Sequence, residues 1–478
     1  MRKLAATLVG LSLLTGCAVG PDYKQPTVPA PDQYREVQGP PAPAPSLADQ
    51  PWWELFADEK LKGLVDEALG TGFDIQLAAF RVEEARARAG IARSEFWPQV
   101  FYGGQLSRTQ LSTYVPPGDH STNNLQNVNV NFGWEIDLWG RIRRANEAAK
   151  AQYLASEEAR KGVLLSLVSD VAITYFQLRE LDEELSIAKN TTESFKETSD
   201  LFERKLNEGA ASALETSYAS AAYNQVAATV PDIERQIEAT ENQLSFLLGK
   251  SPGAIARGRL LLEQPVPPGV PAGLPSELLL RRPDIRQAEQ QLIAANALVG
   301  VATANFFPTI SLTGLIGGAS PTVSQLFPAG RTWTIAAGLL GPLFQGGRLR
   351  SEYDVAYAQW QQAVVFYEQT VTNAFAETTT VLYAREKLAA SVAELARAVD
   401  HYREMVRLTN LRYNSGLANY FEVLYAMQQL FPAEISLARA RLALLTDYVN
   451  IYKALGGGWK IEAPTWQSPA VQPPPAKQ

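Results

Sequence analysis

The chain offers few residues that could carry out covalent chemistry. Its 478 residues include one cysteine, Cys17, and two histidines, His120 and His401. His120 falls in an expected loop and His401 in an expected helix, and neither is spaced from a nucleophile as general-base catalysis requires. Only three methionines are present, and soft metal ions prefer thiolate, thioether and imidazole ligands. We therefore expect no enzymatic activity, no metal site and no cofactor.

The chemistry that the sequence does predict is acylation of its cysteine. Two cations precede an apolar run over residues 4–14, which continues into Leu14-Thr15-Gly16-Cys17. A positive start and a short apolar run are typical of a secretory signal, and the last four residues resemble the processing motif of bacterial lipoproteins. We expect a signal peptide over residues 1–16 and a palmitoylated Cys17 that opens an extended segment, 17–52. An ordinary signal peptide with an incidental cysteine is the alternative.

Composition excludes two classes of protein. The formal net charge is −7, whereas proteins that bind nucleic acid present a basic surface to the phosphates. Outside the N-terminal run, no stretch reaches the ~18–20 continuous apolar residues of a transmembrane helix. We therefore expect no nucleic-acid partner and no bundle of transmembrane helices.

The chain repeats itself across a proline-rich linker. Prolines cluster in residues 21–51, 252–275 and 464–475. Motifs on either side of the middle cluster match in order: Phe96-Trp97-Pro98 with Phe306-Phe307-Pro308, Lys205-Leu206-Asn207-Glu208-Gly209 with Arg412-Tyr413-Asn414-Ser415-Gly416, and Leu247-Leu248-Gly249 with Ala454-Leu455-Gly456. A nearly constant offset indicates a duplication. We predict repeat 1 over 53–250, a linker over 251–275, repeat 2 over 276–458 and a Pro-rich tail over 459–478.

Each repeat contains a very long predicted helix. Helix-forming residues run without proline over 140–208 and 347–415. At 1.5 Å per residue, each helix would be about 100 Å long. Gly209 and Gly416 then allow a tight reversal of the chain.

Return helices are expected after the reversals, over 211–249 and 417–456. Pro231 and Pro432 fall inside them and should kink or interrupt the helices. Such long helix pairs must cover their apolar stripes by packing as coiled coils, within the chain or between chains.

Two pairs of short strands are predicted, one pair before each long helix, over 99–109, 127–138, 308–318 and 331–341. Apolar and polar residues alternate strictly in the second of these. Half-buried hairpins of a soluble domain would show the same alternation. The lipoprotein signal and the aromatic residues at the strand ends favour a surface that faces lipid. Four strands cannot close a barrel, and an open edge is not tolerated in lipid, so we expect oligomers, with three copies enclosing a lumen.

The most specific indication of function is the order of short motifs between residues 17 and 458. They are Gly20-Pro21-Asp22-Tyr23, Trp52-Trp53, Phe56-Ala57-Asp58, Asp74-Ile75, Phe96-Trp97-Pro98, Asp137-Leu138-Trp139-Gly140-Arg141, Arg281-Arg282-Pro283-Asp284-Ile285-Arg286, Gly346-Gly347-Arg348 and Arg412-Tyr413-Asn414-Ser415-Gly416. In this order they resemble the TolC-like outer-membrane efflux factors, in the subgroup of NodT-type lipoproteins.

The resemblance implies an α+β membrane protein with two structural repeats per chain. It implies a homotrimer whose twelve-stranded β-barrel, four strands per chain, crosses the outer membrane and continues as a long periplasmic α-helical barrel of coiled-coil helices. Family members receive small toxic compounds or drugs from an inner-membrane transporter of the RND type through a periplasmic adaptor (membrane fusion) protein. We therefore expect the outer-membrane channel of a tripartite efflux pump, a passive duct in contact with outer-membrane lipid.

The two reversals are candidate docking surfaces. In the family these helical tips meet the adaptor protein. By this resemblance the candidate contacts are Gly209, Ala210, Ala211, Leu214, Gly416, Leu417, Ala418 and Leu424. The alternative is that the two glycines only end their helices.

Glu215 and Glu422 are candidate gate carboxylates, since each lies six residues after its glycine. Three chains would place six carboxylates near the narrow end of the tube. Like charges at ~7 Å in a dielectric of about 20 repel by about 2 kcal/mol per pair. Such a ring would favour cations and raise some of the carboxyl pKa values. Two solvated glutamates on helix surfaces are the alternative.

Two other functions fit the same features. One is the outer-membrane duct of a type I protein secretion system. The other is a periplasmic coiled-coil scaffold lipoprotein whose strands never enter the bilayer. Ion conductance in a planar bilayer separates a duct from a scaffold.

Overall fold

The structure, a computed structural model, describes residues 18–29, 58–110, 112, 114, 122–266 and 278–457. The predicted signal peptide, Cys17, His120 and the tail at 459–478 lie outside the described residues. The chain divides into two compact units. The strand unit comprises residues up to 27 with 81–157 and 287–369, and the helical unit comprises 28–80, 158–286 and the chain from 370 onward.

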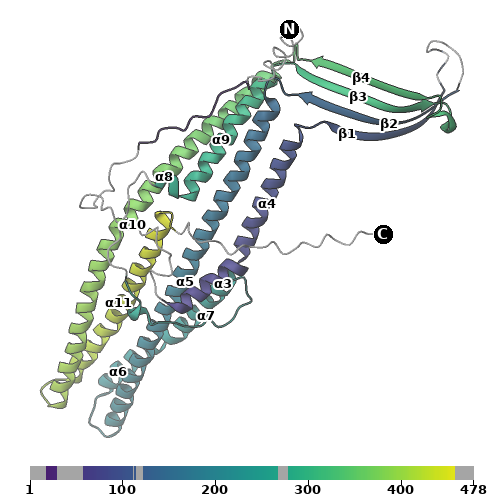
Figure 1. The fold of residues 1–478 in the computed structure, drawn as a ribbon. Coiled ribbons are helices and arrows are strands. Elements are labelled where there is room, and N and C mark those ends of the chain that lie inside the picture. Colours follow the sequence, from purple (N-terminus) through teal and green to yellow (C-terminus); the bar gives the residue numbers. More distant parts are fainter. Residues whose placement is uncertain are drawn as a thin grey trace. The chain divides into compact units, whose positions relative to one another are not determined.

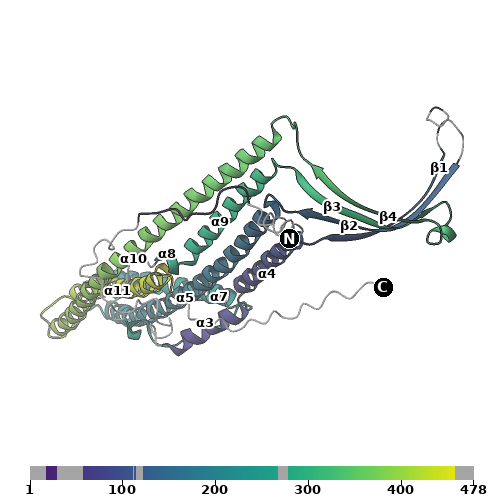
Figure 2. The same cartoon turned by 45° about the horizontal axis from the view of Figure 1, so that its top comes forward.

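The strand unit contains one antiparallel sheet in the order β1-β2-β3-β4 (Figures 1 and 2). Repeat 1 supplies β1 (Gln99–Gln110) and β2 (Thr122–Ile136), and repeat 2 supplies β3 (Thr309–Ser320) and β4 (Arg331–Leu340). The largest difference from the predicted ranges is at β2, which begins five residues before residue 127. Its first residues are mostly polar, so they carry no alternating signal. They are strand because they pair with the end of β1.

The pairing of β2 with β3 joins the two repeats. Gln126 lies opposite Ser320, and the ladder continues to Ile136 opposite Ile310. Phe132 lies opposite Gly314, and a Cβ added to this glycine would lie 1.9 Å from Cε1 of the phenylalanine ring. The aromatic ring of one repeat therefore occupies the space that a side chain of the other would need.

A polar junction connects β2 to the helix that follows it. The Asp137 carboxylate accepts hydrogen bonds from the backbone N–H groups of Ile142 (3.0 Å) and Arg143 (2.9 Å), which are otherwise unpaired donors of a first helical turn. Glu135 and Arg141 form a two-bonded ion pair at 2.9 and 2.7 Å. These contacts fix the direction in which the chain leaves the sheet.

Four helices have residues in both units. They are α4 (Phe73–Ser94), α5 (Arg141–Asn207), α9 (Pro283–Ala304) and α10 (Arg348–Asn414). Both α5 and α10 are unbroken over 67 residues and lie within the ranges predicted for the long helices. Each repeat therefore has the same order of helix, two strands and long helix.

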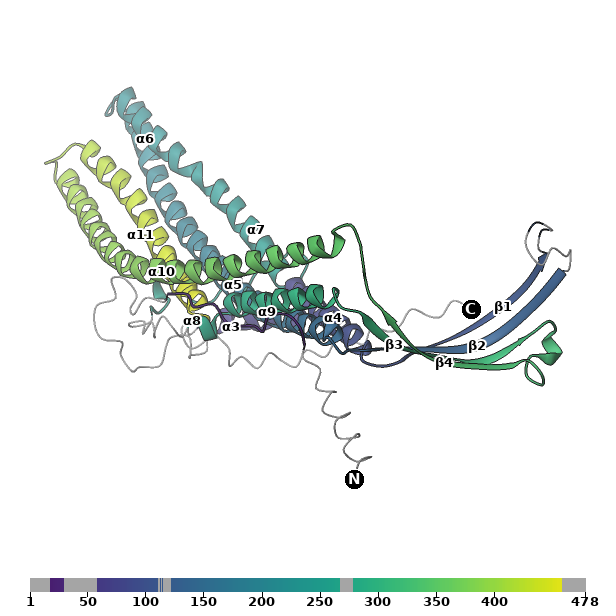
Figure 3. The same cartoon turned by 90° about the horizontal axis from the view of Figure 1, so that it is seen from above.

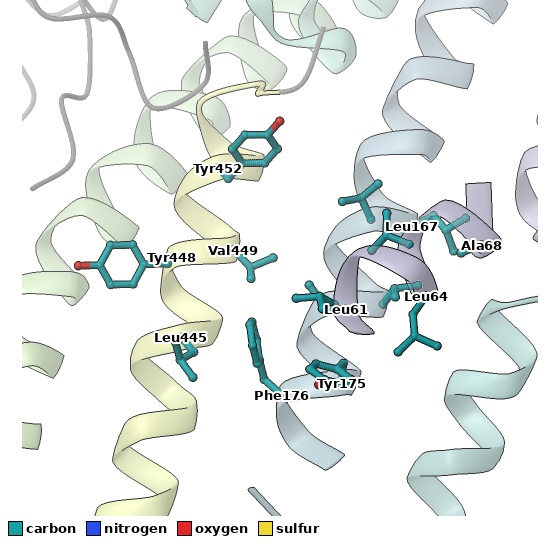
Figure 4. Close-up of a cluster of buried hydrophobic side chains, with 14 of the residues drawn as sticks. Leu61, Leu64, Ala68, Leu167, Tyr175, Phe176, Leu445, Tyr448, Val449 and Tyr452 are labelled. Carbon is teal, nitrogen blue, oxygen red and sulfur yellow. The ribbon is translucent and has the colours of Figure 1, made fainter. Parts of the chain in front are cut away.

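The core of the helical unit forms where α3 (Glu59–Thr71) and α11 (Tyr420–Ala454) pack on α5 (Figure 4). Tyr175 and Phe176 of α5 are fully buried. By length and composition α5 contains a window apolar enough to cross a membrane, but half of that window is buried inside the chain. The core of a folded protein passes the same test.

A buried carboxylate attaches the linker to this core. Asp58 precedes α3 and caps it, accepting from the backbone N–H of Lys60 at 2.9 Å. The same carboxylate accepts from the Tyr175 hydroxyl (2.9 Å) and from the Gln264 amide (2.8 Å). Gln264 follows η2 (Leu261–Glu263), a short helix in the predicted linker. These hydrogen bonds hold the pKa of Asp58 below its usual value against the opposing effect of burial.

The two return helices differ, as Figure 3 shows. In repeat 1 the chain forms α6 (Ala213–Ala227) and α7 (Thr229–Leu247), with Pro231 in the first turn of α7. In repeat 2 α11 continues through Pro432. A break in the return helix is thus present just before Pro231, whereas no interruption occurs at Pro432, where a kink stays a prediction. A proline in a first turn lacks only an N–H that would be unpaired anyway, whereas packing must offset the lost bond at an interior proline.

Candidate functional site

The sheet has one apolar and one polar face. Residues directly opposite each other in an antiparallel pair share a face, so the register assigns every side chain. One face carries Val100, Tyr102, Leu106, Val128, Val130, Phe132, Trp134, Leu312, Ile316, Trp333, Ile335 and Leu339. Nearly all of these are exposed in the single chain. An exposed apolar surface of this extent needs a nonaqueous neighbour.

The other face of the sheet is largely polar. Asn127, Asn129 and Asn131 form a ladder along β2, in which Asn131 donates to Asn129 at 2.6 Å and Asn129 donates to Asn127 at 3.4 Å. Asn127 donates to Gln105 of β1 at 3.4 Å. Apolar residues outward and amides inward are the arrangement of a β-barrel that faces lipid and encloses water.

The two chain reversals lie in the helical unit and have the same backbone geometry. Gly209 and Gly416 have φ values of 74° and 70°. In each turn the residue after the glycine donates five residues back, Ala210 to Lys205 at 2.7 Å and Leu417 to Arg412 at 2.9 Å. This pattern is the Schellman motif, which ends a helix at a residue in the left-handed region. The glycines are required for their backbone conformation, since nothing lies within 4 Å of a Cβ added at either.

Polar and aromatic side chains connect the two hairpins near their turns. The Lys205 ammonium donates to the Tyr413 hydroxyl at 2.7 Å. The Tyr420 ring lies 4.9 Å from the Phe202 ring and 5.0 Å from the Tyr413 ring. Tyr420 also shares a 2.6 Å hydrogen bond with Thr198. Side chains of α5, α10 and α11 therefore form one cluster, and the two turns belong to a single surface.

Most of the predicted docking residues are accessible on this surface. Leu214 and Leu417 are 63% and 71% exposed, and Gly209, Ala210 and Gly416 are exposed too, with Ala211 and Ala418 half-buried. Leu424 is the exception. It is only 5% exposed because it packs against Phe195 and the apolar side of α6. The Leu424 side chain is therefore not accessible in the single chain, and its role as a docking contact stays a prediction.

Aromatic residues that the sequence analysis did not select complete the surface. Tyr425 is 61% exposed, and the Tyr218 and Phe421 rings meet edge to face at 5.3 Å with both rings accessible. Their signal in the sequence was the presence of aromatic residues in the helices that follow the turns. It was weak because aromatic residues at helical spacing are as frequent in cores.

The two candidate gate carboxylates have local partners. Glu215 accepts from the backbone N–H (2.8 Å) and hydroxyl (2.9 Å) of Ser212, and the Ser212 hydroxyl accepts from the Glu215 N–H in a capping box. These bonds, the backbone one foremost, lower the pKa of Glu215. Glu422 lies 3.4 Å from the Arg412 guanidinium, with both side chains about half exposed. A ring of mutually repelling carboxylates requires charges that have no local partners. In the single chain, both carboxylates have one.

Among the described residues, no group of three or more His, Cys, Asp or Glu side chains is placed to hold a metal ion. Two surfaces of the described residues, one in each unit, remain as candidate sites. They are the amide face of the sheet and the joined turns of the helical hairpins.

The family model for outer membrane efflux proteins matches residues 64–250 and 274–457. The chain belongs to this family. Its two matched segments are separated at the predicted linker. As a member of the outer membrane efflux protein family, the chain is a subunit of a transport channel of the outer membrane, as predicted.

Individual relatives agree over nearly the full length. The chain is 36% identical over 468 residues to the solvent efflux pump outer membrane protein SrpC of Pseudomonas putida, covering 96% of this chain and 99% of the relative. The CmeC outer membrane channel of Campylobacter jejuni matches with a TM-score of 0.87 at 27% identity, over 92% of this chain and 95% of CmeC. The open state of the MtrE outer membrane channel of Neisseria gonorrhoeae matches with a TM-score of 0.83 at 31% identity, over 92% and 98%.

These matches confirm the predicted fold class of an α+β outer-membrane channel with two repeats. They also confirm the predicted location, with strands in the outer membrane and helices extending into the periplasm. Family members are transport ducts, and their function as the outer-membrane part of an efflux pump applies to this chain.

Proposed function

We propose that three copies of this chain close into a twelve-stranded barrel and form a passive duct for small toxic compounds. The observation that carries the proposal is the sheet itself. Among the described strands, β1 and β4 each pair on one side only, yet the apolar face requires lipid around it. Lipid does not tolerate an unpaired strand edge, so β4 of one chain must pair with β1 of the next.

Three chains fit the polar face better than two. Eight strands leave an interior just wide enough for side chains, whereas larger barrels retain water. The amide ladder of β2 is suited to a wet lumen, because amides there hydrogen-bond to water as well as to each other. A wide hydrated lumen selects weakly, so the choice of substrate belongs to an inner-membrane pump. Relatives named for solvents, cations and antibiotics have similar chains.

The joined turns are our proposed docking surface for a periplasmic adaptor protein, which would link the duct to an RND-type transporter. Leu214 and Leu417 contribute exposed apolar side chains there, together with Tyr425. A small apolar patch with a polar rim is typical of a protein interface. We further propose that the mature chain is anchored at the outer membrane through an acylated Cys17.

For the gate carboxylates, the local contacts favour unequal roles. Glu215 is committed to its capping box, so its removal would disturb a helix start. Glu422 holds only an exposed ion pair, which contributes little energy. We propose Glu422 as the residue of the pair that responds to a neighbouring chain or adaptor. Unchanged cation selectivity in Glu422→Gln channels would remove this role.

Cysteine cross-linking tests the closed barrel. Val100→Cys in β1 is combined in turn with cysteines at Trp333, Ile335 and Leu339 of β4, all on the apolar face. The control is Tyr102→Cys with Val130→Cys, an opposed pair within one chain. We expect cross-linked trimers for at least one β1–β4 combination, only monomers for the control, and ion conductance in planar bilayers. If no β1–β4 combination cross-linked one chain to another, and the protein did not conduct ions, the duct would be contradicted.

Adaptor docking has a separate test. A photo-reactive amino acid at Leu417 should cross-link to a periplasmic protein in intact cells. The same residue at Leu424, which is buried, serves as the matched control and should not. A purified adaptor that binds Leu214→Asp, Leu417→Asp double variants as tightly as the unchanged protein would contradict this surface.

A further inference from the structure

The four strands contain very few charged side chains. Across β1 to β4 these are Arg108, Glu135 and Arg331. Glu135 lies at the end of the sheet next to the helices, on the polar face, and pairs with Arg141. The two arginines have a different setting, for which the channel function gives no reason.

Both arginines lie on the apolar face. Arg108 is opposite Asn124, in the same alternation as Val100, Tyr102 and Leu106. Arg331 is opposite Gly318 and is followed on the same face by Trp333 and Ile335. Both arginine side chains are exposed. Each therefore lies on the lipid-facing side of the sheet, where the apolar residues give way to polar ones such as Asn124 and Gln126.

Both arginines also lie at the same end of the sheet. Gln110 pairs with Thr122, and Gly318 pairs with Arg331, so both strand connections leave the sheet at this end (Figure 1). We call it the loop end. Because the helices extend into the periplasm from the opposite end, the loop end lies at the outer leaflet of the outer membrane.

Among the described residues, the surroundings of these cations contain no acidic partner. No described residue of the strands near the loop end, or of the connection at 321–330, is acidic. No ion pair joins either arginine to a described carboxylate. Arg331 donates through Nε to the Phe327 carbonyl at 2.7 Å, which leaves its terminal N–H groups available.

We propose that Arg108 and Arg331 form a binding site for the phosphate groups of a phosphorylated outer-leaflet lipid. Arginine binds phosphate through paired N–H donors, and Trp333 supplies the aromatic residue expected where the apolar band meets the headgroups. The proposal rests on the trimeric barrel proposed above. Since β1 and β4 are the two edges, the seam between neighbouring chains brings Arg108 of one chain and Arg331 of the next onto adjacent strands.

The low cost of an arginine at the membrane interface does not by itself account for the placement of these two arginines. An arginine near the interface costs little compared with one at the midplane, so a single arginine at either leaflet would need no explanation. Here two arginines occupy the same end and the same face, on the only strands that meet at a seam. The one acid of the strands lies at the other end and on the other face.

Native mass spectrometry of the detergent-solubilised trimer tests the site. The probes are lipid A with two phosphates, the same lipid after enzymatic removal of its phosphates, and inorganic phosphate alone. The variants are Arg108→Gln, Arg331→Gln, the double variant, and Arg108→Lys with Arg331→Lys. Arg350→Gln is the control, since Arg350 is an exposed helix arginine outside the sheet.

We expect the unchanged protein to bind the phosphorylated lipid more tightly than the dephosphorylated one. Each Gln variant should weaken that binding about fivefold, since one basic residue near an anionic membrane surface contributes about 1 kcal/mol. The double variant should lose more, and the Lys variants should retain most of the binding. Arg350→Gln should bind as the unchanged protein does.

Three results would overturn the site: equal binding of the two lipids, a double variant that binds normally, or displacement of the lipid by an equal concentration of inorganic phosphate. Trimer content and conductance are measured on the same samples. Their loss in the unchanged protein would contradict the duct, whereas normal trimers with no phosphate preference would contradict only this inference.

Discussion

The two helical hairpins began as copies and now reach the same reversal with different residues. Both turns are Schellman motifs built on a left-handed glycine. Beyond the turn, repeat 1 starts its return helix with a capping box of Ser212 and Glu215, whereas repeat 2 uses the Asn419 side chain, which accepts from the Phe421 N–H at 3.2 Å. The comparison teaches that the two repeats keep glycine where only glycine readily adopts the backbone conformation. They differ at the helix caps, where several side chains can accept the hydrogen bond.

The sharpest test of this comparison concerns the two prolines. Pro432→Ala should stabilise the protein, by up to about 3 kcal/mol, because it restores an N–H inside α11 and removes a clash with the preceding turn. Pro231→Ala should change stability by less than about 0.5 kcal/mol, since Pro231 lies in the first turn of α7. Thermal melting of both variants, followed by the helical circular dichroism signal, measures the difference. Equal effects would show that the position of a proline in its helix does not decide how much it destabilises the protein.

The glycines should show no such asymmetry. Gly209→Val and Gly416→Val should each destabilise by roughly 1–2 kcal/mol, because each forces a side chain into the left-handed region. Gly63→Ala, in the interior of α3 with open space around its Cβ, is the control and should stabilise slightly. If valine destabilised the protein in one turn and not in the other, the left-handed backbone conformation would not be what both turns require.

The contact between the hairpins allows a double-mutant cycle. Lys205→Met and Tyr413→Phe each remove one side of the 2.7 Å hydrogen bond. We expect a coupling of about 1 kcal/mol between the two changes. Melting of the two single variants and the double variant measures it. Additive effects would mean that this hydrogen bond does not help to hold the hairpins together.

The helix caps should give the smallest effects. Ser212→Ala removes a capping box and should cost about 1 kcal/mol, and Asn419→Ala should cost a similar or smaller amount. Ser212→Ala should also raise the pKa of Glu215 part of the way towards its ordinary value, because the hydroxyl bond to the carboxylate is lost while the backbone N–H of residue 212 remains. The midpoint of the Glu215 titration, followed by carboxyl NMR, tests this. A midpoint that does not move would mean that the Ser212 hydroxyl does not contribute to the low pKa of Glu215.

Long-range repetition made most of the fold predictable. The offset of about 207–210 residues between matching motifs and the absence of proline located α5 and α10 closely, since helix propensity summed over many residues is informative. In β2, the alternation of apolar residues such as Val130 and Phe132 with polar residues predicted the strand. The polar start of β2 gave no such signal and became strand only through its partner β1.

The candidate site was less predictable. Glycine at a reversal is visible in a sequence, because one backbone conformation demands it. The burial of Leu424 was not visible, because it depends on Phe195 in a distant part of the chain. The ion pair of Arg412 with Glu422 likewise requires two helices to be brought together. Contacts between elements decide these features, and local pattern does not encode them.

The fit of Phe132 against Gly314 has an evolutionary consequence. Two freshly duplicated halves would be interchangeable, and recombination between them could shuffle or erase one copy. Once a ring in the first half occupies the space over a glycine of the second, any side chain introduced at residue 314 would collide with Phe132. This contact therefore makes changes in one half depend on the residue that the other half presents to it.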